Sequence, residues 1–113
     1  MDIPVFKPVI GTKEVENVVE AVSSGDISGT FGRFIGEFEA GFAAYCHAEH
    51  GVAASSGTTA LQLALRAYGV GRGDQVILPT FTNIATCLAV VYEGATPIVV
   101  DSERRTWNMD VDQ

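Results

Sequence analysis

The sequence predicts an α/β fold with a parallel sheet, and two observations support this prediction. Between residues 50 and 101, short apolar runs alternate with segments of helical periodicity, in the order strand, helix, strand, helix, strand. The strands expected at residues 50–54, 75–79 and 97–101 are apolar at nearly every position. Strands of this kind are typical of parallel sheets, whose two faces are covered by helices.

Two further helices are expected before this alternation. Residues 12–24 place valines along one face, with Thr12 as a plausible N-cap and Gly25 as the end of the helix. Residues 33–46 carry an aromatic stripe of a kind that usually forms a core or the buried side of a subunit contact. We therefore divide the chain into an N-terminal arm with helices, residues 1–49, and the start of an α/β domain, residues 50–113.

The helices expected within the α/β region cover residues 58–69 and a segment that follows Asn83 and ends near Glu93. The first of them is entered through a strand, two serines and a glycine. Either Ser55 or Ser56 can cap this helix. Its free N–H groups and positive dipole end suit an anion such as a phosphate. Many domains form the same turn for structural reasons alone, so the pattern by itself leaves both interpretations open.

Composition excludes several classes of protein. The chain has 113 residues and a formal net charge of -7, which disfavours nucleic acid and anionic membranes as partners. No apolar run approaches the roughly 20 residues of a membrane helix, and no signal peptide is recognisable, so a cytoplasmic location is expected. The two cysteines, Cys46 and Cys87, lack metal-site spacing and are expected to be reduced and buried. His47 and His50 flank a glutamate, but they follow a helix end, and no metal site is expected.

In parallel sheets, ligands bind beyond the carboxyl ends of the strands. Three loops are expected to meet there, at residues 55–58, 79–83 and 101–104. Asp101 ends a strand, and we favour a role in capping the turn over a role as a site carboxylate. The glycine-rich loop at residues 26–32 reads on composition as a flexible connector.

These segments together resemble the N-terminal part of the DegT/DnrJ/EryC1/StrS family, and more specifically its perosamine-synthase-like members. The resemblance covers essentially the whole chain in five ordered blocks. The blocks are Ile3–Pro8 with the helix after it, Asp26–Gly32, Ser55–Leu61, Gly73–Thr82 and Gly94–Asp101. The resemblance implies the start of the large domain of a fold-type-I aminotransferase that depends on pyridoxal 5'-phosphate. That domain has three layers, α/β/α, around a mainly parallel sheet, and here a helical arm precedes it.

The resemblance also implies site residues. Ser56, Gly57 and Thr58 match the positions that hold the cofactor phosphate, in agreement with the helix-start argument. Asn83 stands where the family usually has an aromatic side chain stacked on the cofactor ring, which is a departure from its pattern. The loop residues Ser28, Gly29, Thr30 and Phe31 match positions that face a nucleotide-linked sugar at the subunit interface of a homodimer.

The implied activity is conversion of a keto sugar nucleotide to an amino sugar nucleotide, with glutamate as the amino donor. The family's chemistry needs a lysine that bonds to the cofactor, and neither Lys7 nor Lys13 matches its context. We therefore expect no catalytic residue within this chain and interpret it as a piece of a longer enzyme. Two alternatives remain open: a sugar dehydratase of the same family, with histidine in place of that lysine, and a non-catalytic module that binds sugar nucleotides.

Overall fold

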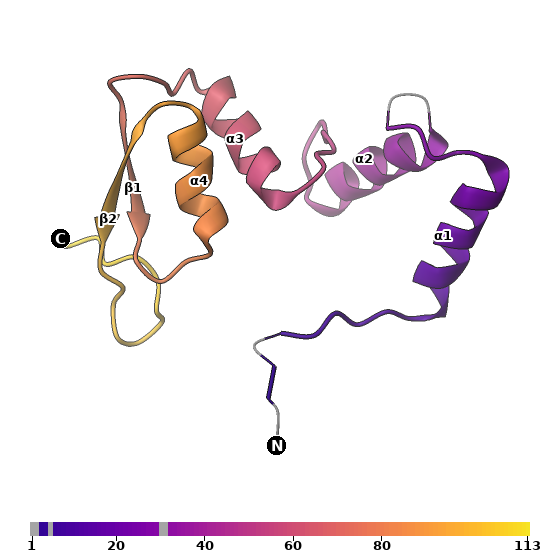
Figure 1. The fold of residues 1–113 in the computed structure, drawn as a ribbon, viewed down its shortest axis with the longest axis horizontal. Coiled ribbons are helices and arrows are strands. Elements are labelled where there is room, and N and C mark those ends of the chain that lie inside the picture. The colour runs from indigo at the N-terminus through magenta and orange to yellow at the C-terminus, as the bar shows by residue number, and fades with distance from the viewer. Residues whose placement is uncertain (1–2, 5, 30–31) are drawn as a thin grey trace. The chain divides into compact units, whose positions relative to one another are not determined.

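The computed structural model in Figure 1 describes residues 3–4, 6–29 and 32–113. The chain forms two compact units, Met1–Ala53 and Ala54–Gln113, and each is considered by itself. The first unit contains helices α1 (Thr12–Ser24) and α2 (Arg33–Tyr45). The second contains helices α3 (Gly57–Ala67) and α4 (Ile84–Tyr92) and strands β1 (Gln75–Pro79) and β2 (Thr96–Val100).

Helix α1 has the predicted bounds but a different N-cap. Its N-cap is Gly11, not Thr12. The Gly11 N–H donates to the carboxylate of Glu14 at 2.7 Å. The acidic side chain in the first turn thus satisfies the N–H of the cap residue, which a threonine cap at position 12 would not reach. Gly25 ends the helix with φ of 75°, as expected of a left-handed C-terminal glycine.

Helix α2 exposes much of its aromatic stripe within the first unit. The rings of Phe38 and Phe42 stack with centroids 5.5 Å apart, yet the two residues are 56% and 54% exposed. Ala43 is the buried residue of this helix. Cys46, at its C-terminal end, is exposed, so the prediction that both cysteines are buried is wrong for Cys46; Cys87 is half-buried in α4.

Residues 50–54 do not form the predicted strand. Within the described residues, β1 pairs with β2 and no third strand lies beside them. A strand requires a neighbour to receive its backbone hydrogen bonds. Here the Ala53 N–H instead donates to the Glu39 carboxylate of α2 at 2.8 Å. A side chain at Gly51 would approach the Glu39 carbonyl oxygen to 2.5 Å, so only glycine fits this close passage.

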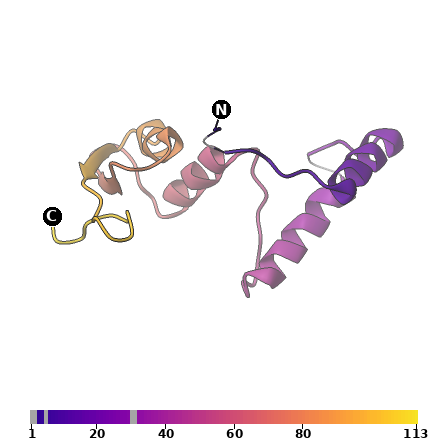
Figure 2. The same ribbon diagram turned by 90° about the horizontal axis from the view of Figure 1, so that it is seen from below.

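The second unit is built around the predicted parallel pair. Strands β1 and β2 run parallel in register from Gln75 opposite Thr96 to Pro79 opposite Val100. Helix α4 lies against both strands, and α3 packs beside α4 (Figures 1 and 2). The helices and both strands of this unit agree with the sequence prediction to within about two residues at their ends.

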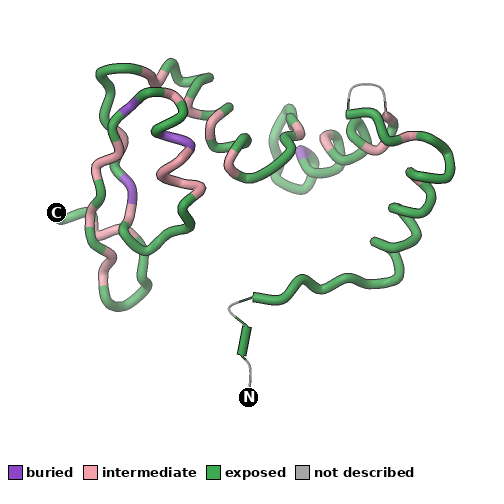
Figure 3. The backbone as a smooth tube through the Cα atoms, in the orientation of Figure 1, coloured by how far each residue is buried: buried purple, intermediate pink, exposed green. Residues whose placement is uncertain are grey.

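The core of the second unit lies between the strands and α4. Leu78, Val90 and Ala95 are buried together, and Leu65 of α3 packs against them. Figure 3 shows the buried positions of this unit on β1, on α4 and just before β2. No helix in the described part of the chain is long and apolar enough to cross a membrane.

Candidate functional site

Helices α3 and α4 both begin at the end of the second unit where the strands finish. Strand β1 leads through residues 80–83 directly into α4. In Figure 1, α3 and α4 start at their lower ends, and the arrowheads of β1 and β2 point to the same side. This is the edge of a parallel sheet at which ligands bind.

Ser56 caps α3, as one of the two predicted alternatives. Its Oγ accepts the N–H of Thr59 at 3.3 Å, and Thr59 Oγ1 accepts the N–H of Ser56 at 3.0 Å. Thr59 Oγ1 also lies 3.3 Å from Ser55 Oγ. The sequence prediction gave Thr59 no part in the cap, although a hydroxyl three residues after a serine cap is a recognisable reciprocal pattern.

The corner that this cap creates leaves two backbone donors free. Within the described residues, the N–H groups of Gly57 and Thr58 have no hydrogen-bond partner. A Cβ added at Gly57 would meet nothing within 4 Å, so the space beside the backbone is open. Two free N–H groups at a helix N-terminus can receive an anion.

Asn83 has a structural role that the family resemblance did not imply. It caps α4, and its Oδ1 accepts the N–H of Ala85 at 3.0 Å. Its Nδ2 has no partner among the described residues. Asparagine directly before an apolar helix is a common cap, and this signal was available in the sequence.

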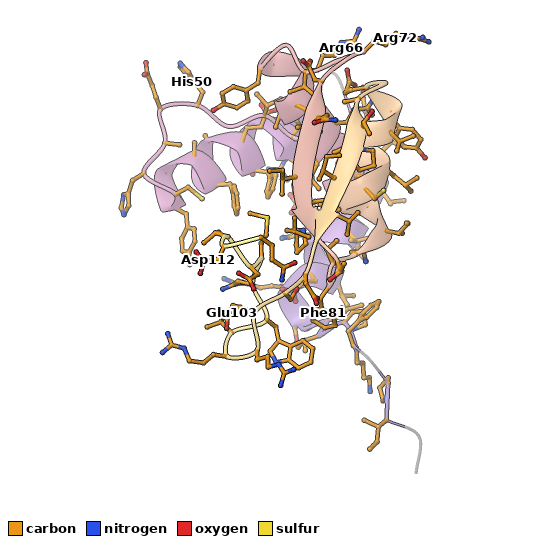
Figure 4. All side chains as sticks on the ribbon, turned by 90° about the vertical axis from the view of Figure 1, so that its left-hand side faces the viewer. His50, Arg66, Arg72, Phe81, Glu103 and Asp112 are labelled. Atoms are coloured by element: carbon orange, nitrogen blue, oxygen red, sulfur yellow. The ribbon has the colours of Figure 1, made fainter. Side chains whose placement is uncertain are left out.

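A cavity of about 570 Å³ opens at the same end of the unit. It is lined by Thr80, Phe81, Asp101, Ser102, Glu103, Arg104 and Trp107. Figure 4 shows Phe81 and Glu103 at this end, with Arg66 and Arg72 at the opposite one. The structure thus brings together two of the three predicted loops, whereas residues 55–58 do not line the cavity.

Asp101 holds the turn after β2, in agreement with the favoured interpretation. Its Oδ1 accepts the Ser102 N–H at 2.8 Å and the Thr80 hydroxyl at 3.3 Å. Two positions on, Glu103 organises a hairpin of residues 102–109, which an antiparallel bridge between Ser102 and Met109 closes and which lines the cavity. Its carboxylate accepts the Thr106 hydroxyl and the N–H groups of Arg105 and Thr106, and these hydrogen bonds, the one from the Thr106 hydroxyl most of all, lower the pKa of Glu103.

The predicted substrate loop lies in the first unit and is closed at its base. The Asp26 carboxylate accepts the N–H of Arg33 at 3.1 Å, and the Gly32 N–H donates to the Ser28 carbonyl at 3.2 Å. The loop is therefore braced at both ends by hydrogen bonds, which the interpretation as a flexible connector did not anticipate. Ser28 and Gly29 are exposed, while Thr30 and Phe31 lie outside the described residues.

His50 pairs with Glu49 at 3.5 Å on an exposed segment. Across the described ranges, no cluster of three histidine, cysteine, aspartate or glutamate side chains could hold a metal.

Comparison with known proteins identifies the family. A family profile described as the DegT/DnrJ/EryC1/StrS aminotransferase family matches residues 8–113. The chain belongs to this family. The GDP-perosamine synthase of Caulobacter vibrioides is 48% identical over 108 residues, which cover 96% of this chain and 29% of that protein. The dTDP-3-amino-3,4,6-trideoxy-alpha-D-glucose transaminase of Streptomyces venezuelae is 58% identical over 64 residues, 57% of this chain and 17% of that protein.

Solved structures confirm the fold. The Streptococcus pneumoniae protein Spr1654, in its PLP form, superposes with a TM-score of 0.84 at 38% identity, over 99% of this chain and 28% of that one. NtdA of Bacillus subtilis, with bound cofactor PMP, gives a TM-score of 0.80 at 34% identity, over 92% and 24%. The chain therefore has the α/β fold of the N-terminal part of these aminotransferases, and it spans less than a third of their length.

Proposed function

We propose that this chain forms the N-terminal part of a pyridoxal-phosphate-dependent aminotransferase that converts a keto sugar nucleotide to an amino sugar nucleotide. Relatives named as GDP-perosamine synthase and as dTDP-amino-sugar transaminase support this activity. Solved relatives in PLP and PMP forms support the cofactor. Glutamate as amino donor, a cytoplasmic location and a homodimeric enzyme are parts of the same proposal.

The observation that carries the proposal is the pair of unpartnered N–H groups at Gly57 and Thr58. They would donate to the cofactor phosphate, and the dipole of α3 would favour its negative charge. The hydroxyls of Ser56 and Thr58 add two further donors at the same corner. When bound, the cofactor supplies an electron sink through which an amino group can be transferred.

Asn83 would contribute from the start of α4. Because its Oδ1 is held by the Ala85 N–H, the plane of its amide is fixed by the cap and its Nδ2 is left to face a ligand. Ser28, Gly29, Thr30 and Phe31 are assigned to the sugar nucleotide. We place the lysine that bonds to the cofactor outside residues 1–113, because neither Lys7 nor Lys13 lies in a matching segment.

The test is the affinity of the full-length protein for pyridoxamine 5'-phosphate, which binds without a covalent bond to lysine. Ser56→Ala combined with Thr58→Val removes two hydroxyl donors and is expected to weaken binding by about tenfold. Thr12→Val is the matched control, because Thr12 also lies in the first turn of a helix but has no predicted ligand. Unchanged affinity in the double variant would contradict the assignment of the phosphate to this corner.

A further inference from the structure

Helices α3 and α4 share a polar contact that does not include the predicted cofactor residues. Glu93, the C-cap of α4, has a side chain that is 6% exposed. Its Oε1 accepts a hydrogen bond from Gln62 Nε2 of α3 at 2.8 Å, and its Oε2 lies 3.8 Å from Arg66 Nη1 of α3. Arg66 lies at the end of the second unit opposite Phe81 and Glu103 in Figure 4.

This contact differs in kind from the apolar packing around it. Leu65 packs against the buried cluster of Leu78, Val90 and Ala95. Apolar contacts are not directional, so they tolerate small rotations of one helix on another. A nearly buried carboxylate must keep its hydrogen bonds, and the fixed length and direction of the bond from Gln62 restrict such rotations.

Both helices carry predicted cofactor residues at their other ends. Gln62 lies five residues after Gly57, a distance of about 7.5 Å along the helix axis. Since a short helix moves nearly as a rigid rod, a rotation at Gln62 displaces the free N–H groups of Gly57 and Thr58 relative to Asn83. The position of one helix start relative to the other is thus set in part by Glu93.

We propose that Glu93 is a positioning residue that, through Gln62, fixes α3 against α4 so that the Ser56–Thr58 corner and Asn83 can bind one cofactor molecule together. The proposal rests on the proposed function and adds to it a residue that touches neither substrate nor cofactor. Arg66 has a smaller part, because its side chain is 76% exposed and its pair with Glu93 is long.

Binding of two ligands can distinguish a residue that positions α3 against α4 from a residue that only stabilises the fold. Pyridoxamine 5'-phosphate would contact both helix starts, whereas inorganic phosphate would contact only the start of α3. Loss of the correct angle between the helices should therefore weaken the first ligand and leave the second unchanged. Unfolding or fraying of α3 should weaken both.

The experiment measures the affinity of the full-length protein for each ligand by calorimetry. Glu93→Ala and Gln62→Leu are each expected to weaken pyridoxamine phosphate about five- to tenfold, with phosphate affinity unchanged. Glu93→Gln keeps an oxygen that accepts the hydrogen bond from Gln62. Glu93→Gln and Arg66→Ala, each made alone, should bind pyridoxamine phosphate with an affinity within about twofold of that of the unchanged protein. Asp74→Ala is the control, because it removes the bond to the Gly71 N–H in the turn before β1 and touches neither helix.

The outcomes divide clearly. Unchanged pyridoxamine phosphate affinity in both Glu93→Ala and Gln62→Leu would overturn the proposal, and so would an equal loss for the two ligands. Gln62→Leu keeps the test decisive if Glu93→Ala does not fold. If the unaltered protein binds neither ligand, the proposed function itself fails, which is distinct from a Glu93 effect that is absent in a protein that binds both.

Discussion

The two units of the chain form equally regular helices but are held together differently. In residues 54–113, β1, β2 and α4 enclose a core of Leu78, Val90 and Ala95. In residues 3–53, Ala43 is the one buried apolar residue among those described. Polar contacts organise that unit instead. The Asp26 carboxylate accepts the Arg33 N–H, and the Glu39 carboxylate accepts the Ala53 N–H.

This contrast shows that periodicity determines the helices and strands, whereas burial also requires another element that packs against them. The valine face of α1 is as regular as any in the second unit, yet Val18 is 64% exposed. In the second unit, a strand, a helix and a parallel strand follow one another within 26 residues, Gln75 to Val100, and can close on each other. The first unit contains no described strand against which its helices could pack.

The largest expected effect tests this contrast directly. Leu78→Ala removes a side chain that is 4% exposed, and it should lower the local unfolding free energy of the second unit by about 2–4 kcal/mol. Val18→Ala should lower that of α1 by less than about 1 kcal/mol. Amide hydrogen exchange of α4 and α1 measures the two quantities separately. A comparable loss for Val18→Ala would show that other parts of the protein cover α1, and the contrast would disappear.

The second prediction concerns the polar closure of the first unit. A Cβ at Gly32 would lie 2.7 Å from Asp26 Oδ1 and 2.8 Å from the Ser28 carbonyl oxygen. Gly32→Ala should therefore force the loop open. We expect it to destabilise the closed loop by about 1–3 kcal/mol and to raise the KM for the sugar nucleotide. Gly36→Ala is the opposite control: nothing lies within 4 Å of its Cβ, and alanine in a helix should stabilise α2 by about 0.5–1 kcal/mol. Equal effects of the two substitutions would mean that the loop is not held as described.

Much of the second unit was predictable, because its signals are local. Alternating strand and helix patterns located β1, α4 and β2, and Ser56 and Gly57 marked the start of α3. Residues 50–54 were wrongly predicted as a strand, since apolar composition does not show whether a neighbouring strand is present. The contact between Gln62 and Glu93 joins residues 31 positions apart, and no local pattern indicates such a pair.

For the candidate site, the assignment of residues to the cofactor stays a prediction. The strand–turn–helix signal and the family resemblance both pointed to Ser56, Gly57 and Thr58, and the geometry leaves two free donors there. The capping function of Asn83 was not predicted, although an asparagine directly before an apolar helix is a common N-cap. No sequence pattern indicated that Trp107 packs on Phe81, with ring centroids 5.2 Å apart. The hairpin that returns Trp107 to the strand ends is defined by the hydrogen bonds of Glu103.

A third prediction concerns Asn83 at the start of α4. Asn83→Ala removes the cap of α4 and should destabilise that helix by about 1 kcal/mol, whereas Asn83→Asp keeps an oxygen for the Ala85 N–H and should be nearly neutral. Asn83→Tyr also loses the cap, but it gains a ring that can stack on the cofactor. We expect it to retain pyridoxamine phosphate affinity and activity at lower thermal stability. Complete loss of binding in Asn83→Tyr would assign a specific polar contact to the asparagine amide.

The smallest expected effect is the pH dependence of the hairpin that lines the cavity. Hydrogen bonds from Thr106 and Arg105 lower the pKa of Glu103 below its ordinary value of 4.5. A carboxyl group with a lowered pKa stabilises the folded hairpin above that ordinary value, and this contribution is lost as pH falls through the lowered pKa. The contact between Phe81 and Trp107 should therefore loosen below about pH 4, with little change between pH 5 and 8.

Fluorescence of Trp107, the one tryptophan of residues 1–113, follows this change. Glu103→Gln should remove the acid transition and give the loosened signal at all pH values, because an amide cannot accept three hydrogen bonds as a carboxylate does. Asp112→Asn, at an exposed position after the hairpin, should leave the transition in place. If the transition survives in Glu103→Gln, protonation of Glu103 is not its cause.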